Sequence, residues 1–389
     1  MARFKIVTTG PGSTDHSLEM EALAGLGAEL VEVSGSEDDL AKAAADADAI
    51  YGKGRPRITA KVIEAGKKLK VVSLGSVGVD SVDVDAATRL GIPVTNVPDT
   101  FIEEVADHAM TLILASWRRL VVQDQMVRKG DWAKGRPMLY EFPRLMGMTL
   151  GFISFGHVAR AVAKRAAPFG FQMLAYDPYI EELVMSEYGV QPVGYDELLQ
   201  RADIVSMHAP GTKDAHHMMK ERQFRLMKKT ALFVNTGRGS TVDEAALIKA
   251  LQEGWIAGAG LDVLETEPVG HNNPLLGMEN VILTAHVASA SNRFDPARKR
   301  RVGAELSLVL SGKWPRACVN PTVLEKSSLQ RWQPFSMERG PGNWPWGGKF
   351  RVASNRSRMA RSHCARLSNG PRTTRSPSST AYQPVWVML

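Results

Sequence analysis

The stretch Thr149-Leu150-Gly151-Phe152-Ile153-Ser154-Phe155-Gly156-His157-Val158-Ala159 joins an apolar run to the start of a helical pattern. The run up to Ser154 has the composition of a buried strand, and the helix is expected to continue to Ala167. A strand that turns into a helix at a glycine is where a dinucleotide-binding fold carries its G-x-G-x-x-G fingerprint. This segment therefore predicts an α/β domain with a phosphate-binding turn.

Gly156 stands at the central position of that fingerprint, where the absence of a side chain lets a pyrophosphate approach the backbone. The helix start adds unpaired N–H groups and about half a positive charge. Ala159 is an accepted variant at the third position, but Ser154 replaces the first glycine. If the turn needs a left-handed backbone there, a non-glycine residue costs about 1 kcal/mol and weakens cofactor binding. Four residues are expected to hold the cofactor here: Phe155, Gly156, His157 and Val158.

Asp177 ends the next expected strand, about 20 residues after Gly156, where this fold places a carboxylate for the ribose 2′-hydroxyl. Its charge would repel a 2′-phosphate, and residues 178–182 contain no Arg or Lys. The pattern therefore favours NAD over NADP. The alternative is that Asp177 is a solvated turn residue before Pro178.

Strand-like and helical segments alternate on both sides of this turn, through the first 325 residues. Several strand candidates, such as 231–234, are apolar on both faces, as buried parallel strands are. The alternation predicts doubly wound parallel sheets, and we expect two of them. The expected strands are Lys5–Thr8, Leu30–Val33, Ala49–Gly52, Lys70–Leu74, Val94–Val97, Thr149–Ser154, Gln172–Tyr176, Ile204–His208, Ala231–Asn235, Ala257–Asp262 and Val281–Thr284.

The net charge of +7 is concentrated at one end of the chain. Residues 326–389 contain eleven of the 48 Lys and Arg side chains but one of the 41 acidic ones, so the preceding part is slightly acidic. Ser, Arg, Pro and Gly dominate this segment, which predicts a disordered, low-complexity basic tail. We expect an incidental extension. The alternative is an arm that binds polyanions such as nucleic acid, which we do not expect of the rest of the chain.

Other classes of protein are disfavoured by what the sequence lacks. It contains no apolar run of about 18 residues, so we expect no transmembrane helix. The first residues lack the pattern of a secretory signal, and we therefore expect a cytoplasmic protein. Cys318 and Cys364 make neither a disulfide framework nor a zinc site, and no metal is expected.

Polar residues follow three of the expected strands in the second half of the chain, at Asn235–Gly239, Asp262–Pro268 and Thr284–His286. In an open parallel sheet, ligands bind beyond the carboxyl ends of the strands. We therefore expect these three segments to face one crevice.

At these segments the chain strongly resembles the D-isomer-specific 2-hydroxyacid dehydrogenases, over about residues 40–324. The branches that it resembles most are the glyoxylate and hydroxypyruvate reductases and the bacterial relatives of the C-terminal-binding-protein co-repressors. The blocks that carry the resemblance are Gly75–Asp80, Val94–Pro98, Ser154–Ala159, Asn235–Gly239, Gly260–Pro268 and Asn280–His286. The resemblance implies a Rossmann-type NAD domain (100–289) inserted in a flavodoxin-like substrate domain (1–99 and 290–325). The helical segments Ile102–Leu120 and Asp295–Leu310 would connect the two, and Trp314–Leu324 would rejoin the first.

The resemblance also assigns catalytic roles that suit the reduction of a 2-keto acid. Arg238 matches the arginine whose planar fork binds the substrate carboxylate and carbonyl. His286 matches the acid/base, and Glu267 matches the carboxylate that orients the imidazole and favours its protonated form. A lone residue at a strand end is usually solvated, but these three occur at the family's positions and in its order.

Further roles follow from the resemblance alone. Asp262 and the Thr236 backbone match the groups that hold the nicotinamide carboxamide, although a strand-end aspartate can also satisfy local amides. Lys53 is expected either to point into the cleft or to be a surface lysine. Ala285 stands where relatives commonly have a proline, so the backbone before His286 is freer and the orientation of His286 less strictly fixed. The other residues expected at the cofactor or substrate are Ala209, Pro210 and Gly237 for the cofactor, and Val77 and Gly78 for the substrate.

We therefore expect an NAD-dependent oxidoreductase that interconverts a small 2-keto acid and its D-2-hydroxy acid. A homodimer through the NAD domain is expected by resemblance. The alternative function is an NAD(H)-sensing scaffold like the co-repressor branch, which the presence of Arg238, Glu267 and His286 does not exclude.

Overall fold

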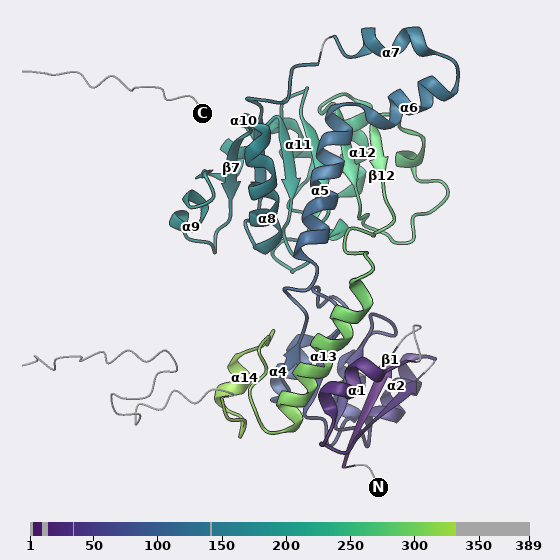
Figure 1. Cartoon of the computed structure of the whole chain (residues 1–389), viewed down its shortest axis with the longest axis vertical. Coiled ribbons are helices and arrows are strands. Elements are labelled where there is room, and N and C mark those ends of the chain that lie inside the picture. The colour runs from purple at the N-terminus through teal and green to yellow at the C-terminus, as the bar shows by residue number, and fades with distance from the viewer. Residues whose placement is uncertain (1–2, 10–14, 34, 141, 332–389) are drawn as a thin grey trace, which may run out of the picture. The chain divides into compact units, whose positions relative to one another are not determined.

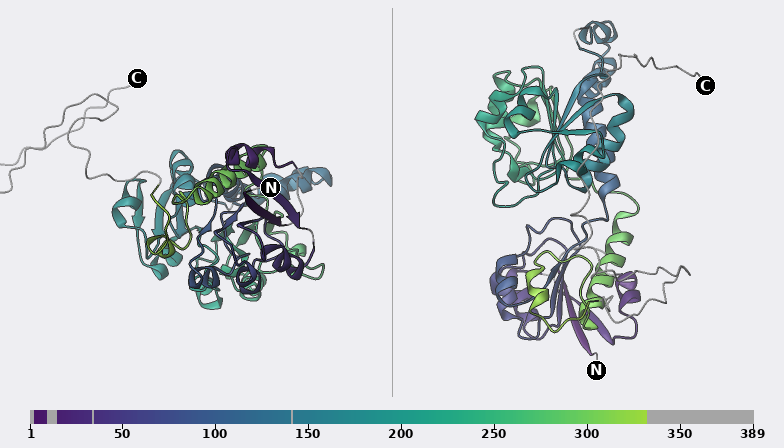
Figure 2. Two further views of the ribbon diagram at one scale, coloured as in Figure 1. Left: turned by 90° about the horizontal axis from the view of Figure 1, so that it is seen from below. Right: turned by 90° about the vertical axis from the view of Figure 1, so that its left-hand side faces the viewer.

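The computed structural model describes residues 3–9, 15–33, 35–140 and 142–331, which contain two parallel β-sheets. All of these residues belong to one compact unit that extends over residues 1–332. The tail predicted for 326–389 lies outside the described residues from position 332 onward. Helices cover both faces of each sheet (Figures 1 and 2).

The first sheet has five parallel strands in the order β2-β1-β3-β4-β5, which is the flavodoxin-like order that the resemblance implied. Neighbouring strands pair in register, for example Ile6 with Ala49 and Ala49 with Val71. The strands are β1 (Phe4–Thr9), β2 (Ala28–Val33), β3 (Ala49–Gly52), β4 (Val71–Leu74) and β5 (Val94–Thr95).

Successive residues of these strands enter two different cores, because side chains alternate between the faces of a strand. Val7 and Ile50 pack with one helical layer, whereas Ile6 and Tyr51 pack with the other. The first layer consists of α2 (Glu37–Ala44), α3 (Ala60–Ala65) and α4 (Val84–Arg89), and the second consists of α1 (Ser17–Leu23) and α13 (Phe294–Leu310).

The second sheet has seven parallel strands in the order β12-β11-β10-β9-β6-β7-β8, which is a Rossmann order with one added strand. The short edge strand β8 was not predicted, because three residues that end in a proline carry too little pattern. The strands are β6 (Thr149–Ile153), β7 (Gln172–Tyr176), β8 (Val190–Pro192), β9 (Ile204–Met207), β10 (Leu232–Asn235), β11 (Gly258–Leu261) and β12 (Val281–Leu283).

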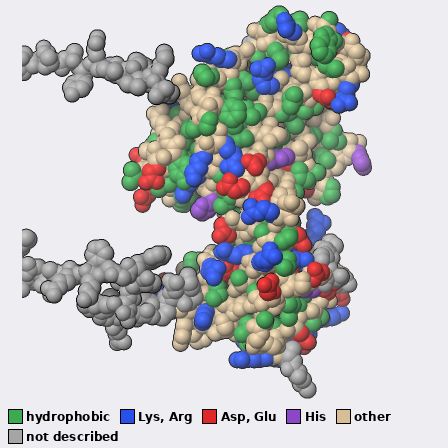
Figure 3. Space-filling view, viewed as in Figure 1, with side chains coloured by type: hydrophobic (Ala, Val, Ile, Leu, Met, Phe, Trp, Pro, Cys, Tyr) green, Lys and Arg blue, Asp and Glu red, His purple; other side chains and the backbone are tan. Residues whose placement is uncertain are grey.

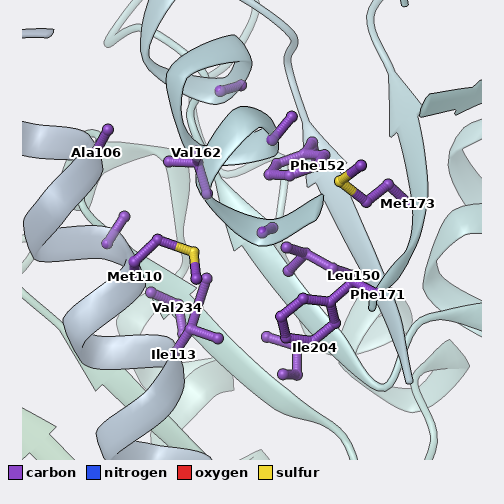
Figure 4. Close-up of a cluster of buried hydrophobic side chains, with 14 of the residues drawn as sticks. Ala106, Met110, Ile113, Leu150, Phe152, Val162, Phe171, Met173, Ile204 and Val234 are labelled. Atoms are coloured by element: carbon purple, nitrogen blue, oxygen red, sulfur yellow. The ribbon is translucent and has the colours of Figure 1, made fainter. Parts of the chain in front are cut away.

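Two apolar cores fix this sheet between its helices. On one face, Met110 and Ile113 of α5 (Ile102–Trp117) and Val162 of α8 (His157–Ala166) pack on Phe152 and Val234 (Figure 4). The other face is covered by α10 (Tyr195–Arg201), α11 (Glu221–Leu226) and α12 (Glu244–Gln252). The remaining short helices of this part are α9 (Glu182–Ser186) and the 3₁₀ turns η1 (Ala167–Phe169), η2 (Gly239–Thr241) and η3 (Pro274–Gly277).

The helix predicted for Ile102–Leu120 is broken near its end. It stops at Trp117, and Arg119 has a left-handed backbone (φ 52°) from which α6 (Leu120–Arg128) and then α7 (Trp132–Met138) follow. The apolar pattern continues across the break, so the break could not be predicted from hydrophobic periodicity. Neither these helices nor any other described helix is long and apolar enough to span a bilayer.

The chain returns to the first sheet after α13, as predicted for Trp314–Leu324. The Val319 N–H donates to the Val94 carbonyl, and the Asn320 side chain accepts from the Val94 N–H. The last helix, α14 (Thr322–Glu325), follows directly. Ordered contacts continue beyond the predicted boundary at 325, because the Trp314 indole donates to the Leu329 carbonyl.

Candidate active site

The turn after β6 has the geometry of a phosphate-binding turn. Gly156 is the N-cap of α8, and a side chain there would meet no atom within 4 Å, so the approach to the helix start is open. Ser154 has a φ of 70°, the left-handed conformation that the sequence led us to suspect at this position. The N-terminal end of α8 thus offers N–H groups and the positive end of the helix dipole to an anion.

Asp177 follows β7 and is bonded to this turn. One oxygen, Oδ2, accepts from the Ser154 hydroxyl at 3.0 Å and from the Phe155 N–H at 2.8 Å, while Oδ1 accepts from the Tyr179 N–H at 2.8 Å. A carboxylate has about four acceptor positions, so these three donors leave one on Oδ1 for a ribose hydroxyl. Asp177 is therefore placed at the turn as predicted, and Ser154 gains a partner that offsets its strained backbone.

The turn that carries Arg238 is shaped by Asn235, the buried last residue of β10. The Asn235 amide accepts from the Gly237 N–H at 2.9 Å and donates to the Arg238 carbonyl at 3.0 Å. The guanidinium then bonds to the Gly237 carbonyl through Nη1. Asn235 was part of the quoted motif but was not assigned a role, because a turn-forming amide cannot be recognised from spacing alone.

Arg238 also meets the loop that was predicted to hold the substrate carboxylate. Its Nε donates to Asp80 Oδ2 at 3.0 Å, and a side chain at Gly78 would lie 1.9 Å from Nη2. Val77, next to this glycine, is exposed. The structure thus brings Val77, Gly78 and Arg238 together, and it adds Asp80, which sequence reasoning missed.

His286 and Glu267 form the predicted pair. Nδ1 of His286 lies 2.7 Å from Glu267 Oε2, and the Leu264 N–H donates to the other oxygen, Oε1. Both side chains are partly exposed. Because Nδ1 donates to the carboxylate, Nε2 on the opposite side of the ring is directed away from it and is available for proton transfer.

The arginine turn and the glutamate loop are packed together at the edge formed by β10 and β11. A side chain at Gly239 would lie 1.9 Å from the Leu264 carbonyl oxygen, so the two backbones are in direct contact. The residue after Leu264 is Glu265, and Glu267 follows two positions later. Glycine at 239 therefore allows the segment of Arg238 to approach the segment of Glu267.

Asp262 is buried, with a side chain that has no exposed surface. Its carboxylate accepts from the backbone N–H groups of Val287 and Ala288 and from the Thr284 hydroxyl, all in the segment around His286. Asp262 thus accepts hydrogen bonds from nearby backbone amides, which was the alternative to a role in cofactor binding. Its role toward a nicotinamide carboxamide stays a prediction, and so does that of the buried Thr236.

The segment after β9 contains His208, buried Ala209 and exposed Pro210. Burial lowers the pKa of His208 to about 4, so this imidazole is uncharged at neutral pH. Its Nε2 lies 2.9 Å from the Ser206 hydroxyl. Ala209 and Pro210 thus follow an uncharged imidazole, and their contact with the adenine side of the cofactor stays a prediction.

Other candidates of the sequence do not join this site. Nζ of Lys53 lies 5.5 Å from the centre of the Tyr51 ring, and burial lowers the pKa of its ammonium. His216 and His217 stack on each other before α11, and His217 pairs with Glu265. The described residues contain no cluster of His, Cys, Asp or Glu that could hold a metal ion.

The structure combines a phosphate-binding turn, an arginine turn and a carboxylate-paired histidine on a Rossmann sheet that is joined to a second parallel sheet. These features define the class of nicotinamide-dependent oxidoreductases. Residues 110–288 match the model of the D-isomer specific 2-hydroxyacid dehydrogenase, NAD binding domain. The chain belongs to the D-isomer-specific 2-hydroxyacid dehydrogenase family. It is an oxidoreductase with a nicotinamide dinucleotide as cofactor.

Similar proteins cover nearly the whole described chain. A glyoxylate reductase of Korarchaeum cryptofilum is 43% identical over 281 residues, which is 72% of this chain and 85% of that protein. The structure of a D-lactate dehydrogenase of Aquifex aeolicus with NAD and lactic acid has a TM-score of 0.71 and 28% identity, and it covers 83% of this chain and 98% of its own. An NADPH-dependent glyoxylate/hydroxypyruvate reductase of Sinorhizobium meliloti, solved with NADP and malonate, has a TM-score of 0.70, 31% identity, and coverages of 85% and 99%.

Proposed function

We propose that this chain reduces a small 2-keto acid, with glyoxylate and hydroxypyruvate as the first candidates, to its D-2-hydroxy acid. The observation that carries the proposal is the contact of the Arg238 turn with the loop of Glu267, which is itself bonded to His286. An anion-binding cation and a proton donor are what the reduction of a keto acid needs beside a hydride source. The 43% identity to a glyoxylate reductase supports the choice of substrate.

In this proposal each side chain has a separate task. Arg238, with the backbone N–H groups of Val77 and Gly78, binds the carboxylate and orients the carbonyl. His286 donates a proton from Nε2 to the carbonyl oxygen, and Glu267 stabilises the imidazolium before that step. The dinucleotide, when bound at Gly156, supplies the hydride. Substrate carboxylate would compete with Asp80 for the guanidinium.

The assay is the loss of NADH absorbance with glyoxylate, hydroxypyruvate and pyruvate. We expect turnover with at least one of them, and a loss of about 10²–10⁴-fold in kcat for His286→Ala, because a positioned acid/base contributes that much. His271→Ala, on an exposed loop, is the matched control and should keep full activity. Wild-type protein that binds NADH but turns over no 2-keto acid contradicts the proposal and favours a scaffold.

The cofactor that we propose is NAD rather than NADP. A 2′-phosphate would lie against Asp177, which three hydrogen bonds hold in place. Asp177→Ala should reduce the preference for NADH over NADPH by about tenfold or more, measured as the ratio of the two dissociation constants. A wild-type protein that binds NADPH as tightly as NADH would refute the assignment.

We further propose that two copies of the chain associate through α6 and α7. No residue of α6 is buried, and Leu120, Val127, Trp132 and Tyr140 are exposed on this segment. Figure 3 shows apolar side chains, in green, among basic ones on this surface. Light scattering should give a dimer for wild type and a monomer for Val127→Glu, and a wild-type monomer at micromolar concentration would contradict the proposal.

A further inference from the structure

The acid/base histidine is held in a backbone conformation that its residue type disfavours. His286 has a φ of 52°, and the preceding residue is Ala285 rather than a conformationally restricted proline. A left-handed non-glycine residue persists only when the surrounding structure holds it there. Neighbouring groups must therefore stabilise the left-handed backbone of His286.

Asp262 is the first of these groups. Its backbone carbonyl accepts from the His286 N–H at 2.8 Å. Its side chain accepts from the next two N–H groups, of Val287 at 2.9 Å and of Ala288 at 3.0 Å. The segment on both sides of the left-handed residue is thus bonded to one buried aspartate.

Thr284 and His108 complete the network. The Thr284 hydroxyl donates its single proton to Asp262 Oδ1 at 2.6 Å, so its oxygen can only accept from His108 Nε2, which lies 2.9 Å away. The same nitrogen lies 3.4 Å from Asp262 Oδ1. His108 Nε2 therefore carries a proton and is the donor that closes the network.

The helix that carries His108 is a rigid support. Its neighbours Ala106, Ala109 and Met110 are buried in the core between α5 and the sheet, and α5 lies beside β12 (Figure 1). His108 thus joins a fixed helix to the exposed loop at the end of β12. In the proposed reaction His108 does not contact the substrate.

We propose that His108 is a positioning residue for the reaction: through Thr284 and Asp262, it holds His286 in the left-handed backbone that aims Nε2 at the substrate. The proposal rests on the proposed function, in which His286 is the acid/base. It assigns to His108 no contact with the reacting atoms.

The test uses full-length His108→Leu and Thr284→Val, which each remove one bond of the network. Each variant should lose about tenfold in kcat, the effect of one hydrogen bond, with the dissociation constant of NADH unchanged within about twofold. The double variant should be no worse than either single one, because both break the same connection. His108→Gln, whose amide can donate from the place of Nε2, and Thr284→Ser should keep most of kcat. The control is Thr111→Val, one turn away on the exposed face of α5, which should match wild type.

Two results overturn the proposal. One is a folded His108→Leu with wild-type kcat, even if its Tm is lowered, because a purely structural histidine would act on stability alone. The other is losses that multiply in the double variant. Amide hydrogen exchange tests this proposal independently of the proposed function. The Val287 and Ala288 amides should exchange faster in His108→Leu than in wild type, whether or not a keto acid is a substrate. Unchanged exchange rates would contradict the proposed network.

Discussion

Two residues of the candidate site have a strained backbone. Among the described residues, four that are not glycine have a left-handed backbone, and Ser154 and His286 are two of them. Ser154 begins the phosphate-binding turn and His286 is the proposed acid/base. Each is compensated by an aspartate at a strand end, Asp177 for the first and Asp262 for the second. Strain that neighbouring residues stabilise is typical of functional sites.

Ser154 allows the strain and the hydrogen bond to be measured separately. Ser154→Ala loses the bond to Asp177 and keeps the strain, whereas Ser154→Gly loses both. Glycine should therefore be the more stable of the two by about 0.5–1 kcal/mol, since part of the relief is offset by the greater freedom of glycine in the unfolded chain. Urea unfolding of the two variants gives this difference directly. A glycine variant less stable than the alanine variant would show that the left-handed backbone is not strained here.

Candidate residues at this scale could be proposed from the sequence only where a motif fixes the residue type. The spacing from Gly156 indicated Asp177, and the resemblance indicated Arg238, Glu267 and His286. The partners Asp80 and His108 were not assigned a role, because each is distant in sequence from the residue that it contacts. Such contacts depend on the folded chain and leave no local pattern.

At the scale of elements, the strands of the two sheets were predictable because buried parallel strands are continuously apolar. The expected segments β3 and β7 coincide with the observed ones. Other bounds differ by a few residues, and the break at Arg119 was not foreseen, since a left-handed residue between two helices changes no hydrophobic period. The turns between strands and helices, where the site lies, were the least predictable.

One such turn makes a prediction about how two elements meet. In Gly239→Ala the new methyl group would overlap the Leu264 backbone, so the arginine turn or the glutamate loop must move. A displacement of about 1 Å of catalytic groups can cost about 10²-fold, and we expect a loss of that size in kcat/KM. Gly277→Ala is the control, because a side chain there meets nothing within 4 Å. Wild-type kcat/KM in a folded Gly239→Ala would show that the close approach is not needed.

For the whole molecule, the chain crosses from one sheet to the other and returns, and the return is fixed by the contact of Val319 with Val94. This pairing joins groups that are far apart in sequence, so it forms only in the folded chain.

The stability of the folded chain toward acid is set by the groups whose protonation differs between the folded and unfolded states. The half-buried His208, in the segment after β9, is one such group.

The folded chain should lose stability as the pH falls below about 6.5, in part because of His208. Burial lowers its pKa to about 4 in the folded state, whereas an unfolded histidine has a pKa of about 6.5. Between these values the unfolded state binds a proton that the folded state does not, so the contribution is present above about pH 6.5 and is lost toward pH 4. Over one pH unit in this range the loss is at most about 1.4 kcal/mol.

His208→Gln, which cannot titrate, should remove this part of the pH dependence. The free energy of unfolding, from urea titrations at pH 7.5, 6.5 and 5.5, should fall less in the variant than in wild type. The value at pH 7.5 serves as the reference for any direct effect of the substitution, for example on the contact with Ser206. If the free energy of unfolding fell equally with pH in the variant and in wild type, His208 would bind its proton equally in the folded and unfolded states. Burial would then not keep this histidine neutral.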